Sequence, residues 1–225
     1  MKGRTRLATG TRTVLVLTHG RPLSIPALVT RVRAILDGWY LGQETGTAVA
    51  EALFGDINPG GKLPVTVARH VGQLPVFYNH KPSARRGYVF DTSQPLFPFG
   101  YGLSYTTFTY ANLRVAPARM GPQDRTTVSV DVTNTGARAG DEVAQLYIRD
   151  VVSTATQPVK QLRGFRRVTL QPGETRTVTF GIGPEHLAYH GPDMKRVVEP
   201  GRFDVMVGGN SVDVRSAPLD VVETP

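Results

Sequence analysis

Apolar residues in the first part of the chain occur in short runs separated by turn residues. Residues 13–18 (TVLVLT) form a continuous apolar run, which is typical of a strand buried on both faces. Residues 25–32 fit a short helix, because Pro26 suits the first helical turn. Residues 34–36 (AIL) then predict a second short strand. The order strand, helix, strand indicates parallel pairing with helices against the sheet.

A longer helix follows the second strand. Residues 43–54 place their apolar side chains on one face at helical spacing, and Gly55 supplies a left-handed C-cap. Residues 58–61 (NPGG) force a turn, and residues 62–67 (KLPVTV) predict another strand or an extended segment. Two or three strands make a small sheet with open edges. We therefore expect residues 1–107 to be the C-terminal part of a larger α/β domain.

The pattern changes near Phe108. Residues 68–107 are rich in Pro, Gly and aromatic residues and predict a long irregular connection, which is typical of a functional loop or of a segment that wraps another surface. Beyond it, about seven short strands separated by turns predict an antiparallel sandwich over residues 108–225. The strands are expected at residues 126–132, 143–148, 162–170, 175–182, 196–198, 203–207 and 212–222, with a helical turn at residues 186–189.

Charge and composition exclude several classes of function. The net charge is +8, but residues 1–100 hold 12 Lys/Arg against 5 Asp/Glu and residues 101–225 hold 14 against 13, so the excess lies in the first part. These cations are scattered without interleaved aromatic residues, which argues against a nucleic-acid partner. There are no cysteines, and no apolar run is long enough for a membrane helix. Residues 1–13 are basic but lack the apolar core of a signal peptide, which leaves localisation open.

Several segments, in order along the chain, resemble glycoside hydrolase family 3, which includes β-glucosidases and β-xylosidases. They are residues 14–25 (VLVLTHGRPLSI), 39–44 (WYLGQE), 52–64 (ALFGDINPGGKLP), 73–81 (QLPVFYNHK) and, most specifically, 95–108 (PLFPFGYGLSYTTF). Residues 132–136 (VTNTG), 141–147 (DEVAQLY) and 162–165 (LRGF) resemble its fibronectin type III-like domain. The resemblance begins at about Leu7 and covers nearly the whole chain. It implies that the chain contains the C-terminal part of the family's α/β sandwich domain, followed by the fibronectin-like domain.

The resemblance also implies where the chemistry lies. The family nucleophile is an Asp on a preceding (β/α)₈ barrel, and the acid/base is usually a Glu upstream of the strand matched by residues 14–18. Retaining hydrolysis requires two carboxyl groups about 5–5.5 Å apart. Because neither family segment occurs in this sequence, we assign it no catalytic residue and expect it to be inactive as a hydrolase by itself.

Six residues are candidates for a place near the substrate. His19 and Arg21 follow the first strand, where open α/β sheets tend to bind ligands, although both could brace loops. Glu44 begins the long helix, where a carboxylate offsets the helix dipole, and chemistry is the alternative. Asp91 lies in the long irregular connection and could line a cleft or brace the loop.

A basic loop completes this set. His80 and Lys81, together with Arg85 and Arg86, could meet a sugar, a neighbouring domain or only solvent. The five histidines (19, 70, 80, 186 and 190) lack metal-ligand spacing, and no phosphate-binding glycine loop is present, so neither a metal nor a cofactor is expected.

Two hypotheses for function remain. The first is a scaffold fragment or subunit of a β-glycosidase, which meets a β-linked glucoside or xyloside only within the full enzyme and could associate with a barrel-bearing chain. The second is a non-catalytic module that binds polysaccharide or protein. Hydrolysis of an aryl β-glucoside, as opposed to binding of insoluble glucan without hydrolysis, separates them.

Overall fold

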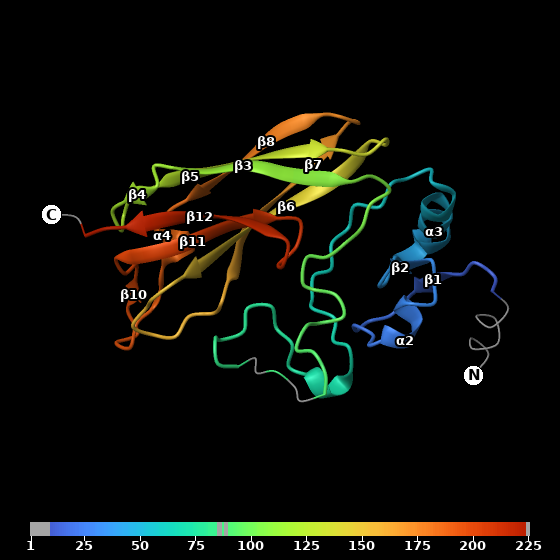
Figure 1. Cartoon of the computed structure of the whole chain (residues 1–225), viewed down its shortest axis with the longest axis horizontal. Coiled ribbons are helices and arrows are strands. Elements are labelled where there is room, and N and C mark those ends of the chain that lie inside the picture. Colours follow the sequence, from blue (N-terminus) through green and yellow to red (C-terminus); the bar gives the residue numbers. More distant parts are fainter. Residues whose placement is uncertain (1–9, 85–86, 88–89, 224–225) are drawn as a thin grey trace.

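The computed structural model describes residues 10–84, 87 and 90–223. Figure 1 shows a β-sandwich, a small α/β part that carries the described N-terminal residues, and an irregular segment that runs between them. Arg85 and Arg86, which belong to the predicted basic loop, lie outside the described residues, as does Leu7.

The α/β part is built on two parallel strands, as the sequence predicts. β1 (Val14–Leu17) pairs with β2 (Ala34–Asp37) in a register that sets Val14 beside Ala34 and Leu17 beside Asp37. Helix α2 (Pro26–Val29) connects them and begins at Pro26, but it is shorter than the predicted residues 25–32. A 3₁₀ turn, η1 (Gly42–Glu44), leads into helix α3 (Thr45–Phe54). Gly55 ends α3 with a φ of 85°, the left-handed conformation expected of a glycine C-cap.

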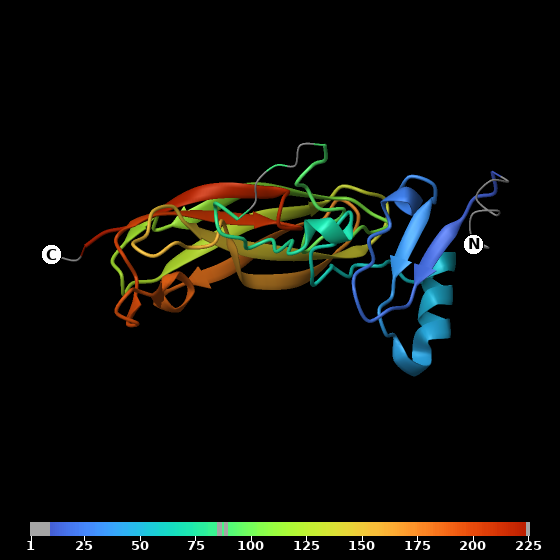
Figure 2. The ribbon, with the colours of Figure 1, turned by 90° about the horizontal axis from the view of Figure 1, so that it is seen from below.

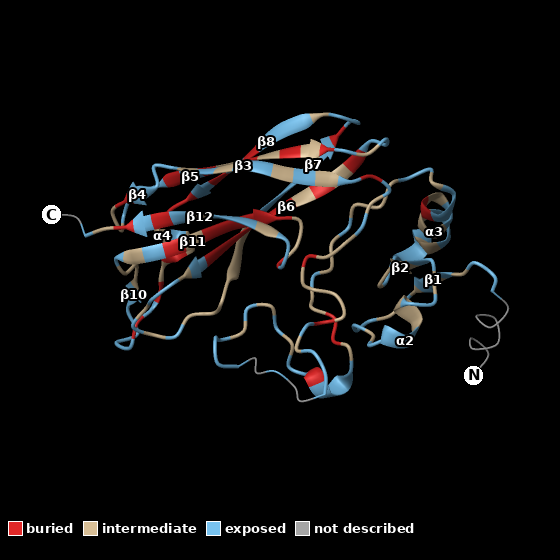
Figure 3. Cartoon of the chain, viewed as in Figure 1, coloured by how far each residue is buried: buried red, intermediate tan, exposed pale blue. Residues whose placement is uncertain are grey.

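This part of the molecule buries little of its apolar surface. Within the described residues 10–57, Ala52 is the one buried hydrophobic residue, whereas Val14 is 44% exposed and Phe54 is 85% exposed. Figure 3 shows the contrast: buried residues gather on the sandwich strands, while β1, β2 and α2 are intermediate or exposed. A sheet of two strands leaves main-chain groups at its edges unpaired. The α/β part therefore presents surfaces suited to further packing.

The irregular segment carries little regular structure, as predicted. Residues 62–67 do not form a strand; a single antiparallel bridge joins Val67 to Phe97. Pro64 interrupts this stretch and cannot donate a ladder hydrogen bond, which explains why an extended conformation replaces the strand. A 3₁₀ turn, η2 (Val71–Gln73), follows. Leu63 N donates to Tyr101 O and Gly100 N donates to Leu63 O, so the two halves of the segment run together in space.

The sandwich consists of two principal sheets. A five-stranded sheet has the order β4-β12-β11-β6-β7, and a three-stranded sheet has the order β3-β5-β8. Neighbouring strands are antiparallel except for β4 and β12, which are parallel. The strands are β3 (Phe108–Ala116), β4 (Arg119–Met120), β5 (Thr126–Asn134), β6 (Gly140–Asp150), β7 (Gln161–Leu170), β8 (Thr175–Ile182), β11 (Gly201–Gly208) and β12 (Val214–Val221). Figure 2, turned by 90°, shows these strands as an elongated body beside the α/β part.

Alternating side chains from both sheets fill the sandwich core. Val128, Val130 and Val132 of β5 are fully buried and pack with residues such as Leu146 of β6 and Val205 of β11. Their spacing of two is what a strand with one buried face requires. A short helix, α4 (Pro184–Leu187), and a small sheet of β9 (Tyr189–His190) and β10 (Arg196–Val197) complete the described structure. The α/β part followed by an all-β sandwich is the fold class that the sequence predicts.

Candidate functional site

A histidine–aspartate pair lies at the C-terminal edge of the parallel strands. His19 follows β1, and Asp37 is the last residue of β2. Because the strands are parallel and in register, their C-terminal ends meet at one edge. His19 Nε2 lies 2.6 Å from Asp37 Oδ1, and the His19 side chain is only 8% exposed. The carboxylate therefore fixes the ring orientation and holds a proton on Nε2.

Trp39 and Gly20 shape this edge. Trp39 has a φ of 50°, which is uncommon for a bulky residue, and its ring lies 5.0 Å from the His19 ring. The amide of His19 donates to Trp39 O at 3.3 Å. At Gly20, a Cβ atom would lie 2.6 Å from the Tyr40 hydroxyl, so a larger residue would require the exposed Tyr40 side chain to shift. Trp39 therefore lies beside the histidine ring, and Tyr40 lies against the glycine that follows the histidine.

The His19 Nδ1 atom is the ring nitrogen of this pair that is available to a further partner. It is buried and has no hydrogen-bond partner within the described part of the chain. With the proton on Nε2, Nδ1 carries a lone pair and can accept a hydrogen bond. An unsatisfied buried acceptor costs about 1–3 kcal/mol. A donor from a further segment or from a ligand would remove that cost.

Two other predicted residues lie in the same part of the molecule. Arg21 is exposed, two positions beyond His19. Glu44 occupies the N-cap position of α3, and its carboxylate accepts a hydrogen bond from Thr47 Oγ1 at 3.2 Å. A carboxylate at this end of a helix interacts favourably with the partial positive charge of the dipole. The structure thus shows a local structural role for Glu44.

The remaining predicted residues belong to the irregular segment. His80 O accepts a hydrogen bond from Val159 N at 3.0 Å, and Lys81 Nζ donates to Thr156 O, so both residues are fastened to a loop of the sandwich. Asp91 Oδ2 lies 2.9 Å from His70 Nε2 in an exposed pair. The six candidates therefore occupy separate surroundings instead of forming one cluster.

The six predicted candidates do not include Asp37 or Trp39. A usable signal existed for Asp37, because it ends an apolar run parallel to the strand that precedes His19. Nothing in the sequence indicates the positive φ of Trp39, which depends on tertiary contacts.

A buried ion pair joins the irregular segment to the sandwich. Lys62 Nζ lies 3.1 Å from Glu142 Oε2, and the side chains are 15% and 5% exposed. The Tyr110 hydroxyl donates to Glu142 Oε1 at 2.8 Å. Burial, followed by the charge of Glu142, raises the pKa of Tyr110 well above its usual value, so the phenol stays protonated and keeps donating. Both carboxylate oxygens of Glu142 are therefore paired.

Asn58 makes a second connection at this junction. Its Nδ2 donates to Ala139 O at 2.8 Å, while its Oδ1 accepts from Ser104 Oγ at 2.8 Å and from the Tyr105 amide at 2.7 Å. The Tyr105 hydroxyl then donates to Ala52 O at 2.6 Å, which reaches helix α3. A continuous set of hydrogen bonds thus links α3, the irregular segment and the turn before β6. We call the contacts of Asn58, Lys62 and Tyr105 the junction.

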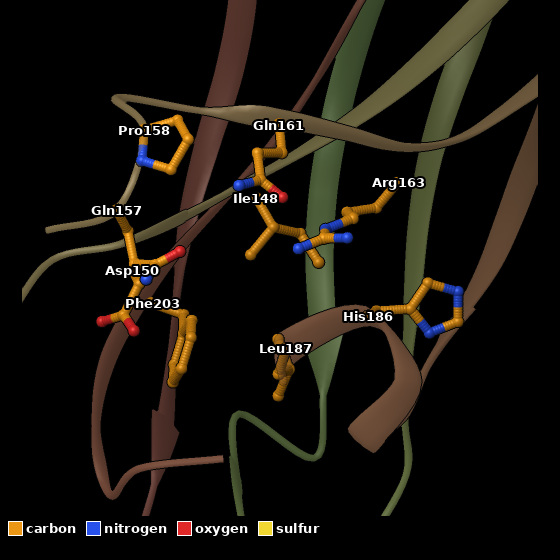
Figure 4. A pocket seen from close by; sticks show the side chains of 9 residues that line it. All are labelled: Ile148, Asp150, Gln157, Pro158, Gln161, Arg163, His186, Leu187 and Phe203. Atoms are coloured by element: carbon orange, nitrogen blue, oxygen red, sulfur yellow. The ribbon is translucent and has the colours of Figure 1, made fainter. Parts of the chain in front are cut away.

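The sandwich contains a small cavity of its own, which Figure 4 shows between Asp150, Arg163 and His186. Its volume is about 20 Å³, enough for one water molecule and too small for a substrate. Asp150 Oδ2 and Arg163 Nε are buried without a hydrogen-bond partner among the residues described. Burial, and secondarily the charge of Glu199, raises the pKa of Asp150 to about 6. The cavity is a place for ordered water and not a catalytic cleft.

Neither a metal cluster nor a membrane-spanning helix occurs in the described part of the chain. No group of three or more His, Cys, Asp or Glu side chains gathers there. No helix there is both long and apolar enough to cross a bilayer.

Comparison with known families matches both parts of the molecule. The model described as Glycosyl hydrolase family 3 C-terminal domain matches residues 4–105, and the Fibronectin type III-like domain model matches residues 142–211. The first match contains the His19–Asp37 pair and the irregular segment, and the second contains most of the five-stranded sheet.

Individual relatives extend over nearly the whole chain. A beta-xylosidase of Formosa agariphila is 46% identical over 219 residues, covering 95% of this chain and 30% of the relative. A periplasmic beta-glucosidase of Salmonella typhimurium is 44% identical over 226 residues, covering 96% of this chain and 30% of the relative. This chain therefore spans about a third of the length of these relatives.

Solved structures agree with the observed fold. A β-glucosidase of Erythrobacter marinus superposes with a TM-score of 0.95 at 50% identity, covering 98% of this chain and 29% of that one. A β-glucosidase of Listeria innocua in complex with glucose gives a TM-score of 0.93 at 34% identity, covering 98% of this chain and 32% of that one.

Proposed function

Because the chain belongs to glycosyl hydrolase family 3, with that family's C-terminal α/β part and a fibronectin type III-like domain, we propose that it is the scaffold portion of a β-glycosidase. In this role it presents the C-terminal edge of β1 and β2 to the catalytic machinery, and the sandwich holds that edge in place through the junction. The substrates of the whole enzyme would be β-linked glucosides or xylosides.

The observation that carries this proposal is the state of the His19–Asp37 pair. A buried imidazole is oriented by a carboxylate at the edge of a sheet where α/β proteins bind ligands, and its second nitrogen lacks a partner. Trp39 lies beside it, and Tyr40 lies against the adjacent Gly20. Such an arrangement positions a donor from another segment or a substrate hydroxyl and does not itself perform hydrolysis. Arg21, which is exposed, is the nearest predicted candidate along the chain.

The proposal assigns no catalytic carboxylate to this chain. Asp37 is bonded to His19, Glu44 to Thr47, and Asp91 to His70. Retaining hydrolysis needs one carboxyl group as nucleophile and a second as acid/base about 5–5.5 Å away. We infer that both come from a barrel-bearing part of the enzyme, in the same or an associated chain.

The two parts of the chain have different roles in this proposal. We propose that residues 1–107 form the α/β part with its irregular connection and that residues 108–225 form the fibronectin-like domain. Under this division, His80 and Lys81 act at the interface between the two and lie away from the glycosidic bond that is cleaved, because both are bonded to the 156–159 loop.

Reconstitution tests the proposal. The purified chain is assayed with an aryl β-glucoside and an aryl β-xyloside, alone and mixed with a separately produced barrel-bearing portion of the Salmonella typhimurium relative. We expect no hydrolysis by the chain alone and measurable hydrolysis by the mixture. His19→Ala should lower the reconstituted activity, whereas His190→Ala, on the small distal sheet, should leave it unchanged.

Two results would contradict the proposal. The first is hydrolysis by the rigorously purified chain alone that disappears in Asp91→Asn or Glu44→Gln. The second is reconstituted activity that is equally insensitive to His19→Ala and His190→Ala, because the pair would then have no positioning role.

A further inference from the structure

An open groove lies between the irregular segment and the sandwich. Its volume is about 250 Å³. One wall comes from residues 66, 78, 80, 94, 95, 98 and 99 of the irregular segment, and the other from residues 159–160 and 211–212 of the sandwich. The groove thus exists only because the two parts meet here.

Hydrogen bonds across the groove hold its walls at a fixed separation. Val159 N donates to His80 O at 3.0 Å, and Ser211 N donates to Phe99 O at 3.0 Å. On the sandwich side, Lys160 Nζ donates to Ser211 O at 2.7 Å. A ligand that enters therefore meets a preformed surface and does not have to order loops, which lowers the entropic cost of binding.

Uncommitted polar groups line this surface. His80 Nδ1 donates to Lys81 O at 2.8 Å, which leaves Nε2 as an acceptor. The Gln94 side-chain amide and the Thr66 hydroxyl make no hydrogen bond within the described part of the chain. Together they offer donors and acceptors for several hydroxyl groups of one ligand.

Apolar surfaces lie beside these polar groups. Tyr78 and Phe99 stack with centroids 4.2 Å apart, and Pro95 and Pro98 complete that wall. No Asp or Glu lines the groove, which disfavours a cationic ligand. The Lys160 ammonium is already bonded to a carbonyl, and burial lowers its pKa, which disfavours a site designed around an anion. The groove therefore combines hydrogen-bonding side chains with apolar surfaces and offers no charge to pair with an ion. These properties suit a neutral ring that carries several hydroxyl groups.

We propose that this groove binds one neutral sugar unit of a β-linked glucan or xylan chain. The choice of a β-linked chain rests on the proposed function, whereas the neutral sugar ring follows from the groove itself. The volume lies below the roughly 300–1,000 Å³ of pockets that enclose drug-sized ligands, so the groove accommodates a single ring while the rest of the chain leaves through the open side. Such a site holds the polymer weakly and raises its local concentration.

A titration of the isotope-labelled 225-residue chain tests this proposal. Xylotriose and cellotriose are added while backbone amide resonances are followed. We expect saturable shifts with a dissociation constant on the order of 1 mM, centred on residues 78–80, 94–99 and 211–212. Gln94→Ala should weaken binding about fivefold, because it removes one hydrogen-bonding side chain. Its matched control is Gln123→Ala, on an exposed turn, which should bind like the unchanged chain.

A second pair of variants provides an independent check. Thr66→Ala should weaken binding by a similar factor, whereas Thr127→Ala, exposed on β5, should have no effect. An oligogalacturonate tests the charge argument and should bind no more tightly than the neutral trisaccharides.

Several outcomes would overturn the proposal: shifts that do not saturate, shifts confined to residues outside the groove, or equal binding by Gln94→Ala and Gln123→Ala. Tighter binding of the oligogalacturonate would show that the groove takes an anion instead. The reconstitution assay is independent of all these outcomes. Restored hydrolysis without sugar binding in the groove would refute only the groove, and sugar binding without restored hydrolysis would refute only the scaffold role.

Discussion

Replacing the buried acid Asp150 by asparagine should change how the stability of the protein depends on pH. Asp150 ends β6 and lines the small cavity in Figure 4. Burial and the neighbouring Glu199 disfavour its charged form, while a hydrogen bond from the Val152 backbone opposes them, and the net effect raises its pKa from 3.8 to about 6. Arg163 lines the same cavity, but its Nε and Asp150 Oδ2 are both buried without a hydrogen-bond partner in the described part of the chain.

The direction in which stability changes with pH follows from the number of protons that each state binds at Asp150. Between pH 3.8 and about 6 the folded state holds more protons at Asp150 than the unfolded state. The favourable contribution of Asp150 is therefore fully present below pH 3.8 and is lost as the pH rises to about 6. A pKa difference of one corresponds to about 1.4 kcal/mol, so the full difference sets an upper bound of about 3 kcal/mol. Because Asp150 is partly exposed to solvent, we expect about 1–2 kcal/mol.

Denaturant unfolding at pH 4, 5, 6 and 7 measures this difference. The free energy of unfolding of Asp150→Asn, relative to the unchanged protein, should rise by about 1–2 kcal/mol between pH 4 and pH 7. Asp220→Asn, at an exposed position on β12, serves as the control and should give a smaller change over the same range. A relative stability of Asp150→Asn that stays flat or falls with rising pH would refute the reasoning, because it would mean that the charged carboxylate is not disfavoured by folding.

Three further predictions concern contacts between the irregular segment and the sandwich, and the stability of the α/β part. In urea unfolding, Gly100→Ala should lower the free energy of unfolding by more than about 2 kcal/mol. The reason is that Gly100 has a φ of 78° and that a Cβ atom there would lie 2.1 Å from Gln145 Oε1. The control is Gly181→Ala, whose Cβ would meet no atom within 4 Å and which should change the free energy of unfolding by less than about 0.5 kcal/mol. Glu142→Leu should cost about 3 kcal/mol, since the buried Lys62 ammonium loses its carboxylate partner and keeps only the Gly102 carbonyl. The double variant with Lys62→Met should cost less, and additive losses would disprove the coupling. Backbone amides of β1 and β2 should exchange with deuterium faster than those of β5, because they belong to a sparsely buried sheet; equal protection would show that the α/β part is as stable as the sandwich.

Local sequence patterns predicted the elements whose causes are local. Helix α3 follows from its apolar spacing, and Gly55 ends it because glycine alone adopts the required left-handed conformation without a steric cost. The parallel pair of β1 and β2 follows from two short apolar runs on either side of Pro26. Most sandwich strands follow from alternation, as the buried valines of β5 illustrate.

Features that depend on distant contacts could not be predicted in this way. Strand β3 was not identified individually, because its register shifts between Ala111 and Arg114, where Asn112 has a φ of 53°, and this breaks the alternation. The His19–Asp37 bond joins residues 18 positions apart and exists only because two strands pair. The groove likewise depends on a segment folding back onto the sandwich, and the hydrophobic pattern of the sequence does not predict that contact.

The main-chain acceptors of the irregular segment have a consequence for how the protein can change during evolution. Sandwich groups donate to main-chain carbonyls of the irregular segment: Gln145 Nε2 to Gly100 O, Val159 N to His80 O, Ser211 N to Phe99 O and Thr135 N to Thr107 O. A carbonyl persists whichever side chain its residue carries, so substitutions at His80, Phe99 and Thr107 do not delete the acceptors of these bonds. His80 and Phe99, which line the groove, can therefore vary in side chain while their main-chain bonds still hold the segment on the sandwich. Substitutions at such positions can thus change which ligand is bound without requiring compensating substitutions in the sandwich.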